Sequence, residues 1–121
     1  VLPQRIQEIW PNVDPTTQPW FVHASSGPLL ELPIAAFADY ATAAEIVAIF
    51  DAAHVRLRSD PDRDVFVVLG FHQETAADFA GRIREAIDQI RRRPALVGEL
   101  VYTTVERAAE QARGALAVHL E

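Results

Sequence analysis

The hydrophobic pattern of the chain repeats three times as an apolar segment followed by a helix with one apolar face. The apolar segments cover residues 29–37, 65–71 and 99–103, and apolar side chains at helical spacing follow each of them. A strand that leads through a helix into the next strand gives parallel pairing with right-handed crossovers. The pattern therefore predicts an α/β fold of three strand-helix units with parallel strands.

Each predicted helix is preceded by a threonine with an acidic residue three positions later. In a capping box the threonine accepts a hydrogen bond from a free backbone N–H, and the acidic side chain bonds back to the threonine N–H. We expect capping boxes at two helices and a simple cap at the other. The boxes are Thr42 with Glu45 and Thr103 with Glu106, and the simple cap is Thr75 with Asp78.

The first 28 residues differ from the rest because they contain five prolines, which fix φ and remove backbone donors. We expect residues 1–28 to be a Pro-rich arm with a short extended piece at 20–22, and residues 29–121 to be the α/β domain. Trp10 and Trp20 are expected to pack the arm on the core, and the alternative is that they stack on a ligand. Three units match either a small open sheet or a partial (β/α) barrel, and in both architectures ligands bind at the carboxyl ends of the strands.

Composition narrows the classes of partner. The net charge of -6 disfavours nucleic acid, because binding to phosphates depends on lysine and arginine. The absence of cysteine excludes disulfides and thiolate metal sites, and no apolar run approaches the roughly 20 residues of a membrane span. We expect a soluble domain. The sequence does not determine its cellular compartment, although the cytoplasm is favoured. Because the chain contains no Met, we expect the natural start to lie elsewhere.

His72 is the leading candidate for a catalytic residue, because it follows the second predicted strand directly. A histidine can act as a general acid or base near neutral pH. Glu74 is close enough in sequence to orient the ring or to cap the next helix. The alternative is that His72 only forms a hydrogen bond with a neighbouring loop.

Other polar residues near the predicted strands have two interpretations each. Asp39 either binds a sugar hydroxyl or is a turn residue, and the turn is favoured. Glu31 lies within an apolar segment, so it is either buried with a partner or solvated at an edge. His54 flanks the apolar stripe of the first helix and is expected on the surface. No two histidines have the spacing that places both on one metal ion, so the sequence predicts no metal site.

Two short segments resemble a known family. Residues 27–33 (GPLLELP) are similar to a strand of the polysaccharide deacetylases, and residues 67–74 (VVLGFHQE) are similar to the late strand of that family that ends in histidine. The helix at 79–90 and the segment 101–106 resemble the way in which such chains finish. The likeness runs from about Trp20 to Ala112 and covers the C-terminal half of the family's domain.

The resemblance implies a hydrolase that removes acetyl groups from amino sugars. His72 would protonate the leaving amine, and Leu32 or Trp20 would line the pocket for the acetyl methyl group. Glu31 and Glu74 complete the set of candidate substrate-binding residues.

The family's divalent, zinc-like metal and its catalytic base are held by an earlier Asp-Asp strand and a His-x-x-x-His helix, and neither motif occurs here. We therefore expect no cofactor in this chain, which alone should be inactive. The complete enzyme would need the missing N-terminal half, on the same chain or supplied by association, together with a carbohydrate substrate. The alternative is a non-catalytic α/β module that binds a partner protein or small ligand through the arm and the strand ends.

Overall fold

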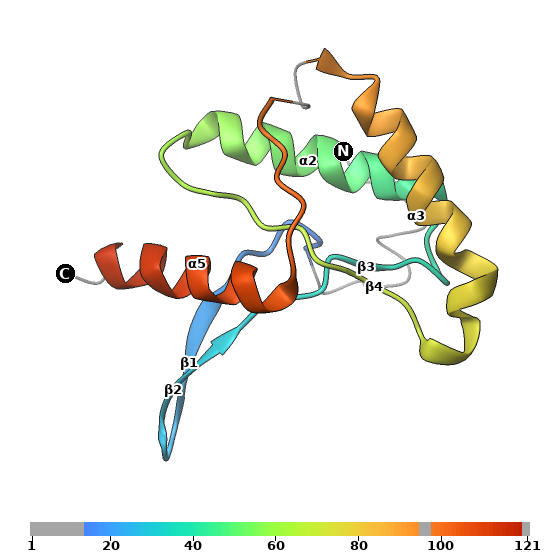
Figure 1. Ribbon diagram of the computed structural model, residues 1–121. Coiled ribbons are helices and arrows are strands. Elements are labelled where there is room, and N and C mark those ends of the chain that lie inside the picture. The colour runs from blue at the N-terminus through green and yellow to red at the C-terminus, as the bar shows by residue number, and fades with distance from the viewer. Residues whose placement is uncertain (1–13, 95–97, 120–121) are drawn as a thin grey trace.

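The computed structural model describes residues 14–94 and 98–119, which form a mixed α/β fold (Figure 1). Two small sheets, one antiparallel and one parallel, lie among three α-helices, and these residues form no closed barrel. The strands are β1 (Trp20–Ala24), β2 (Gly27–Glu31), β3 (Ala36–Phe37) and β4 (Leu69–Gly70). The helices are α2 (Ala43–Ser59), the short 3-10 helix η1 (Gln73–Thr75), α3 (Ala76–Arg91) and α5 (Val105–His119).

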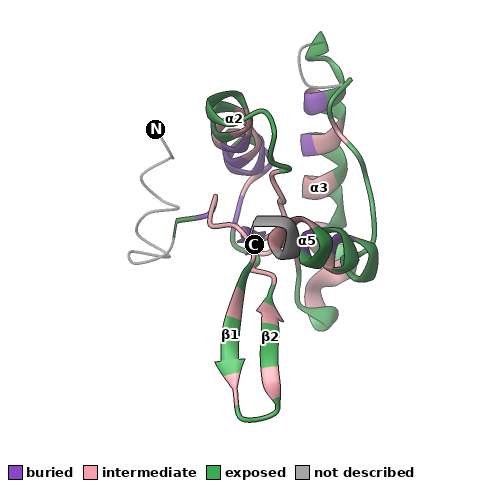
Figure 2. Ribbon diagram, turned by 90° about the vertical axis from the view of Figure 1, so that its left-hand side faces the viewer, coloured by how far each residue is buried: buried purple, intermediate pink, exposed green. Residues whose placement is uncertain are grey.

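β1 and β2 form an antiparallel hairpin that projects from the rest of the fold (Figures 1 and 2). Its turn leads into Gly27, whose φ of 119° lies in a region that favours glycine. The predicted extended piece at 20–22 is thus confirmed as part of β1. The side chain of Trp20, however, is 44 % exposed on the projecting hairpin, so its predicted packing on the core is wrong. Trp10 lies outside the described residues.

The prediction of one continuous strand over residues 29–37 is wrong. The segment is divided between the end of β2 and the two residues of β3, with residues 32–35 between them. Pro33 lies in this break, and a proline cannot donate to a strand ladder. The chain can therefore leave the hairpin and start a second sheet within a few residues.

β3 and β4 pair in parallel, as predicted for the first two units, with Phe37 opposite Gly70. The ladder extends by one bond at each end, because Ala35 N donates to the Val68 carbonyl and Ala38 N to the Gly70 carbonyl, each at 2.8 Å. The third predicted strand, 99–103, is not a strand in the described structure. The parallel sheet consequently has two strands where the sequence predicted three.

The three predicted caps have different outcomes. The Thr42–Glu45 capping box is confirmed, with Glu45 N donating to Thr42 Oγ1 at 3.2 Å and Thr42 N donating to Glu45 Oε1 at 3.0 Å. Thr75 does not cap α3, because its hydroxyl donates instead to the His72 carbonyl at 3.2 Å. At α5 the cap lies one residue later than predicted, where Thr104 Oγ1 accepts from Arg107 N at 3.3 Å.

The core lies between β3 and the facing sides of α2 and α3 (Figure 2). Ile46 and Ile49 from α2 are fully buried, and Ile90 from α3 is 1 % exposed. Small alanines such as Ala36 and Ala86 fill much of the remaining core, so the elements can approach closely. No helix in the described part of the chain is long and apolar enough to cross a membrane.

Candidate functional site

The carboxyl ends of β3 and β4 bring together an aspartate and a histidine. Asp39 lies two residues after β3, and His72 lies two residues after β4. Because the strands are parallel and in register, both residues emerge at the same edge of the sheet. His72 Nδ1 lies 2.5 Å from Asp39 Oδ2, and the pair is called the Asp39–His72 dyad below.

The polypeptide turn after β3 aims Asp39 at the imidazole. The backbone N–H groups of Tyr40 and Ala41 both donate to the Phe37 carbonyl at 3.0 Å, which reverses the chain directly after the strand. The Asp39 side chain within this turn is only 8 % exposed, whereas the His72 side chain is 47 % exposed. The dyad thus has a shielded carboxylate and an imidazole that a ligand can reach.

Two aromatic rings fix the plane of the imidazole. Phe37 stacks on His72 with ring centroids 5.2 Å apart and planes inclined by 20°. The Tyr40 ring meets His72 edge to face at 5.7 Å and 74°. Rotation of the ring would break both contacts as well as the bond to Asp39, so the imidazole is held in one orientation.

The charge state of Asp39 decides which nitrogen of His72 carries a proton. Burial raises the pKa of Asp39, but the hydrogen bond from His72, a backbone N–H and the charge of His72 together bring it below the usual 3.8. Asp39 is therefore ionised at neutral pH, and a carboxylate only accepts hydrogen bonds. His72 Nδ1 must be the donor, which leaves Nε2 to exchange a proton with a ligand.

The predicted catalytic residue thus lies at a strand end, as expected, but its partner was missed. Glu74, the predicted orienting residue, is exposed on η1, while Asp39 makes the bond to the ring. Asp39 was assigned to a turn, and it does lie in one. The sequence signal for its role is its position shortly after the predicted strand 29–37, just as His72 follows the predicted strand 65–71.

The other predicted substrate-binding residues belong to the hairpin or lie next to it. Trp20 and Glu31 are cross-strand partners in the hairpin, and Leu32 follows β2 directly and is half-buried. Glu31 is exposed, in agreement with the solvated alternative. Figure 1 shows the hairpin pointing away from the loop between β4 and α3, so the fold does not gather these residues around His72. Their role in binding a substrate stays a prediction.

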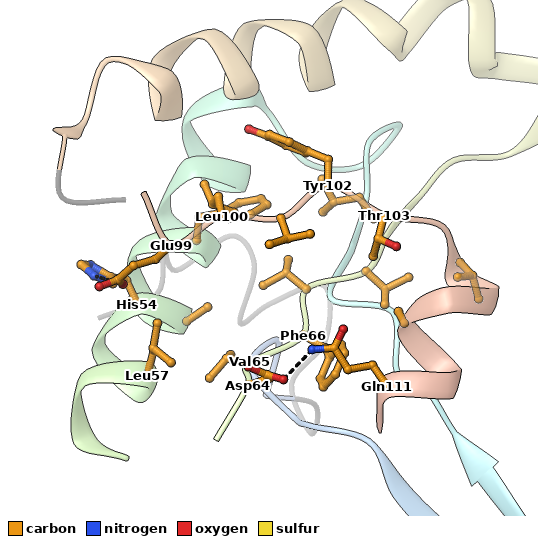
Figure 3. Close-up of a pocket in the computed structure, with 18 of the residues that line it drawn as sticks. His54, Leu57, Asp64, Val65, Phe66, Glu99, Leu100, Tyr102, Thr103 and Gln111 are labelled. Carbon is orange, nitrogen blue, oxygen red and sulfur yellow. Dashed lines mark hydrogen bonds and ion pairs between the residues drawn. The ribbon is translucent and has the colours of Figure 1, made fainter. Parts of the chain in front are cut away.

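A groove with a volume of about 420 Å³ lies elsewhere, between α2, residues 64–69, residues 99–105 and the start of α5 (Figure 3). Its lining is mainly apolar and includes neither residue of the dyad. At one end His54 Nε2 lies 3.3 Å from Glu99 Oε2, and with a side chain 14 % exposed His54 is not the surface residue that was predicted.

The described residues do not form a metal site. No three His, Cys, Asp or Glu side chains among them converge on a point where an ion could be held. The dyad supplies two residues, fewer than the three or four protein ligands that a zinc site needs. An imidazole that is bonded through Nδ1 to an ionised carboxylate can exchange a proton with a ligand through Nε2.

Comparisons of the chain with protein-family models, curated proteins and solved structures give no match.

Proposed function

We propose that this chain is the C-terminal portion of a polysaccharide-deacetylase-like hydrolase that acts on acetylated amino sugars, with His72 as its proton donor. The observation that carries the proposal is the 2.5 Å contact between His72 Nδ1 and Asp39 Oδ2 at the ends of two parallel strands. The similarity of residues 27–33 and 67–74 to segments of that family supports the same assignment.

The reaction explains why an Asp-His pair would be placed there. Hydrolysis of an acetamide transfers the acetyl group from the sugar nitrogen to a water oxygen. The nitrogen cannot leave as an amine anion, so it must receive a proton as the C–N bond breaks. Protonated His72 delivers its Nε2 proton to that nitrogen as the C–N bond breaks. The ionised Asp39 stabilises the protonated ring and holds the proton on Nδ1, so that Nε2 can accept a new proton from water.

The remaining machinery would come from the missing N-terminal half, which lies earlier in a longer protein or on an associated chain. In the resembling family a zinc-like divalent metal supplies activation of water and of the carbonyl. The described residues do not fit such an ion, and the role proposed for this chain is proton donation by His72. In this proposal the parallel pair of β3 and β4 is part of an incomplete (β/α) barrel, and the chain alone is inactive.

The test is acetate release from oligomers of N-acetylglucosamine by the protein expressed from its complete reading frame, with added Zn²⁺. We expect His72→Ala to lower kcat about 10²- to 10⁴-fold, the range for loss of a general acid. His23→Ala, an exposed histidine on β1, is the matched control and should keep full activity. Turnover that survives in His72→Ala, or an inactive wild type, would contradict the proposal.

A non-catalytic module that binds a small ligand is the second candidate, and the groove in Figure 3 favours it. Its volume of about 420 Å³ falls within the range of small-molecule sites. If the groove is the functional site, an apolar dye should bind there and Thr103→Trp, at its exposed rim, should block the dye. His72→Ala should leave that binding unchanged.

A further inference from the structure

Arg82 of α3 reaches the turn that carries Asp39. Its Nη1 donates to the backbone carbonyls of Ala38, Asp39 and Ala41, at 3.0, 3.3 and 3.4 Å respectively. The guanidinium also lies over the Phe79 ring, 4.3 Å from its centroid, one helical turn earlier. The Arg82 guanidinium therefore binds three carbonyls of a single turn, and it also makes a cation-π contact with an aromatic ring of its own helix.

These contacts join the two segments that supply the dyad. Asp39 lies on the turn after β3, whereas His72 lies on the segment that enters η1 and then α3. Between these segments the sheet provides a short parallel ladder, which is the two-residue pairing of β3 and β4 with one further hydrogen bond at each end. Arg82 adds a link from α3 across to the turn, and its acceptors include Asp39 itself and the residue before it.

We propose that Arg82 is a positioning residue that holds Asp39 within bonding distance of His72. The guanidinium fixes the carbonyls on both sides of the Asp39 side chain, and this sets the direction in which the carboxylate points. Without it the turn can rotate, and the short contact between Oδ2 and Nδ1 is the first to lengthen. The catalytic consequence rests on the proposed function, but the effect on the dyad does not.

The experiment observes the Nδ1 proton of His72 by NMR, because a proton shared with a carboxylate is shifted downfield and protected from exchange. Arg82→Ala should abolish this signal. Arg82→Lys keeps the charge but lacks the planar guanidinium with its several donors, so this variant should show part of the wild-type signal. Arg84→Ala is the matched control, because Arg84 is exposed on the same helix, and it should leave the signal unchanged. In the turnover assay of the complete protein we expect kcat to fall about 10²-fold in Arg82→Ala, as for a small misplacement of a catalytic group, with KM little changed.

A folded Arg82→Ala variant that keeps the Nδ1 signal would overturn the proposal. If Arg82→Ala does not fold, a wild-type signal in Arg82→Lys would show that Arg82 serves stability alone, and this too would overturn it. A reduced signal in folded Arg82→Lys supports the proposal in either case. Failure of the proposed function gives a different result, because His72→Ala would then keep its turnover while Arg82→Ala still lost the Nδ1 signal.

Discussion

Ile90→Ala tests whether α3 is fixed to the core, on which the placement of Arg82 and His72 depends. The Ile90 side chain is 1 % exposed and belongs to the core cluster between α2 and α3. The substitution removes three carbon atoms, and at roughly 0.8 kcal/mol for each buried carbon their transfer alone costs about 2.4 kcal/mol. The cavity left behind raises the expected loss to between about 2 and 5 kcal/mol.

The free energy of unfolding is measured by urea denaturation with helical circular dichroism as the signal. A loss of this size is a large fraction of the roughly 5 to 15 kcal/mol that stabilises a typical domain. Ile83→Ala on the same helix should cost less, because Ile83 is only partly buried against the core. Val101→Ala should cost less than about 0.5 kcal/mol, because Val101 is 80 % exposed. If Ile90→Ala costs no more than Val101→Ala, α3 does not pack as described.

Two further predictions concern a helix cap and the charge of the dyad. Thr42→Ala removes the capping box of α2 and should lower the free energy of unfolding by about 0.5 to 2 kcal/mol, whereas Thr103→Ala, which removes no cap, should have little effect. For Asp39 the pKa lies below 3.8 in the folded chain, so its ionised form stabilises the fold above that pH, and this contribution is lost as the pH falls through the folded pKa. The difference in the free energy of unfolding between wild type and Asp39→Asn, measured by urea denaturation, should therefore be larger at pH 7 than at pH 3. An equal difference at both pH values would refute the lowered pKa of Asp39.

The sequence contains clear signals for the features that depend on residues close together in the chain. The capping box of Thr42 and Glu45 depends on residues three positions apart, and it forms as predicted. The hairpin also had a local signal, because residues 25–27 (SSG) separate two apolar stretches, as in many hairpins. That signal and Pro33 both oppose one continuous strand over residues 29–37, which the apolar composition of the segment favours.

The features that the sequence did not predict depend on contacts between residues far apart in the chain. Residues 99–103 have the composition of a strand, but the described fold gives them no ladder partner, and Val101 remains almost fully exposed. Asp39 and His72 are 33 residues apart, and their contact depends on the register that places Phe37 opposite Gly70. The sequence alone could place each residue at a strand end, but it could not supply that register.

The bond between Asp39 and His72 is tested most directly by the tautomer of neutral His72 in the unmodified chain. The tautomer is read from the ¹⁵N shifts of the two ring nitrogens at a pH where the ring is uncharged. We expect the proton on Nδ1, where Asp39 accepts it, and the free lone pair on Nε2. A proton on Nε2 would contradict the bond between Asp39 and His72, and with it the proposed proton donor.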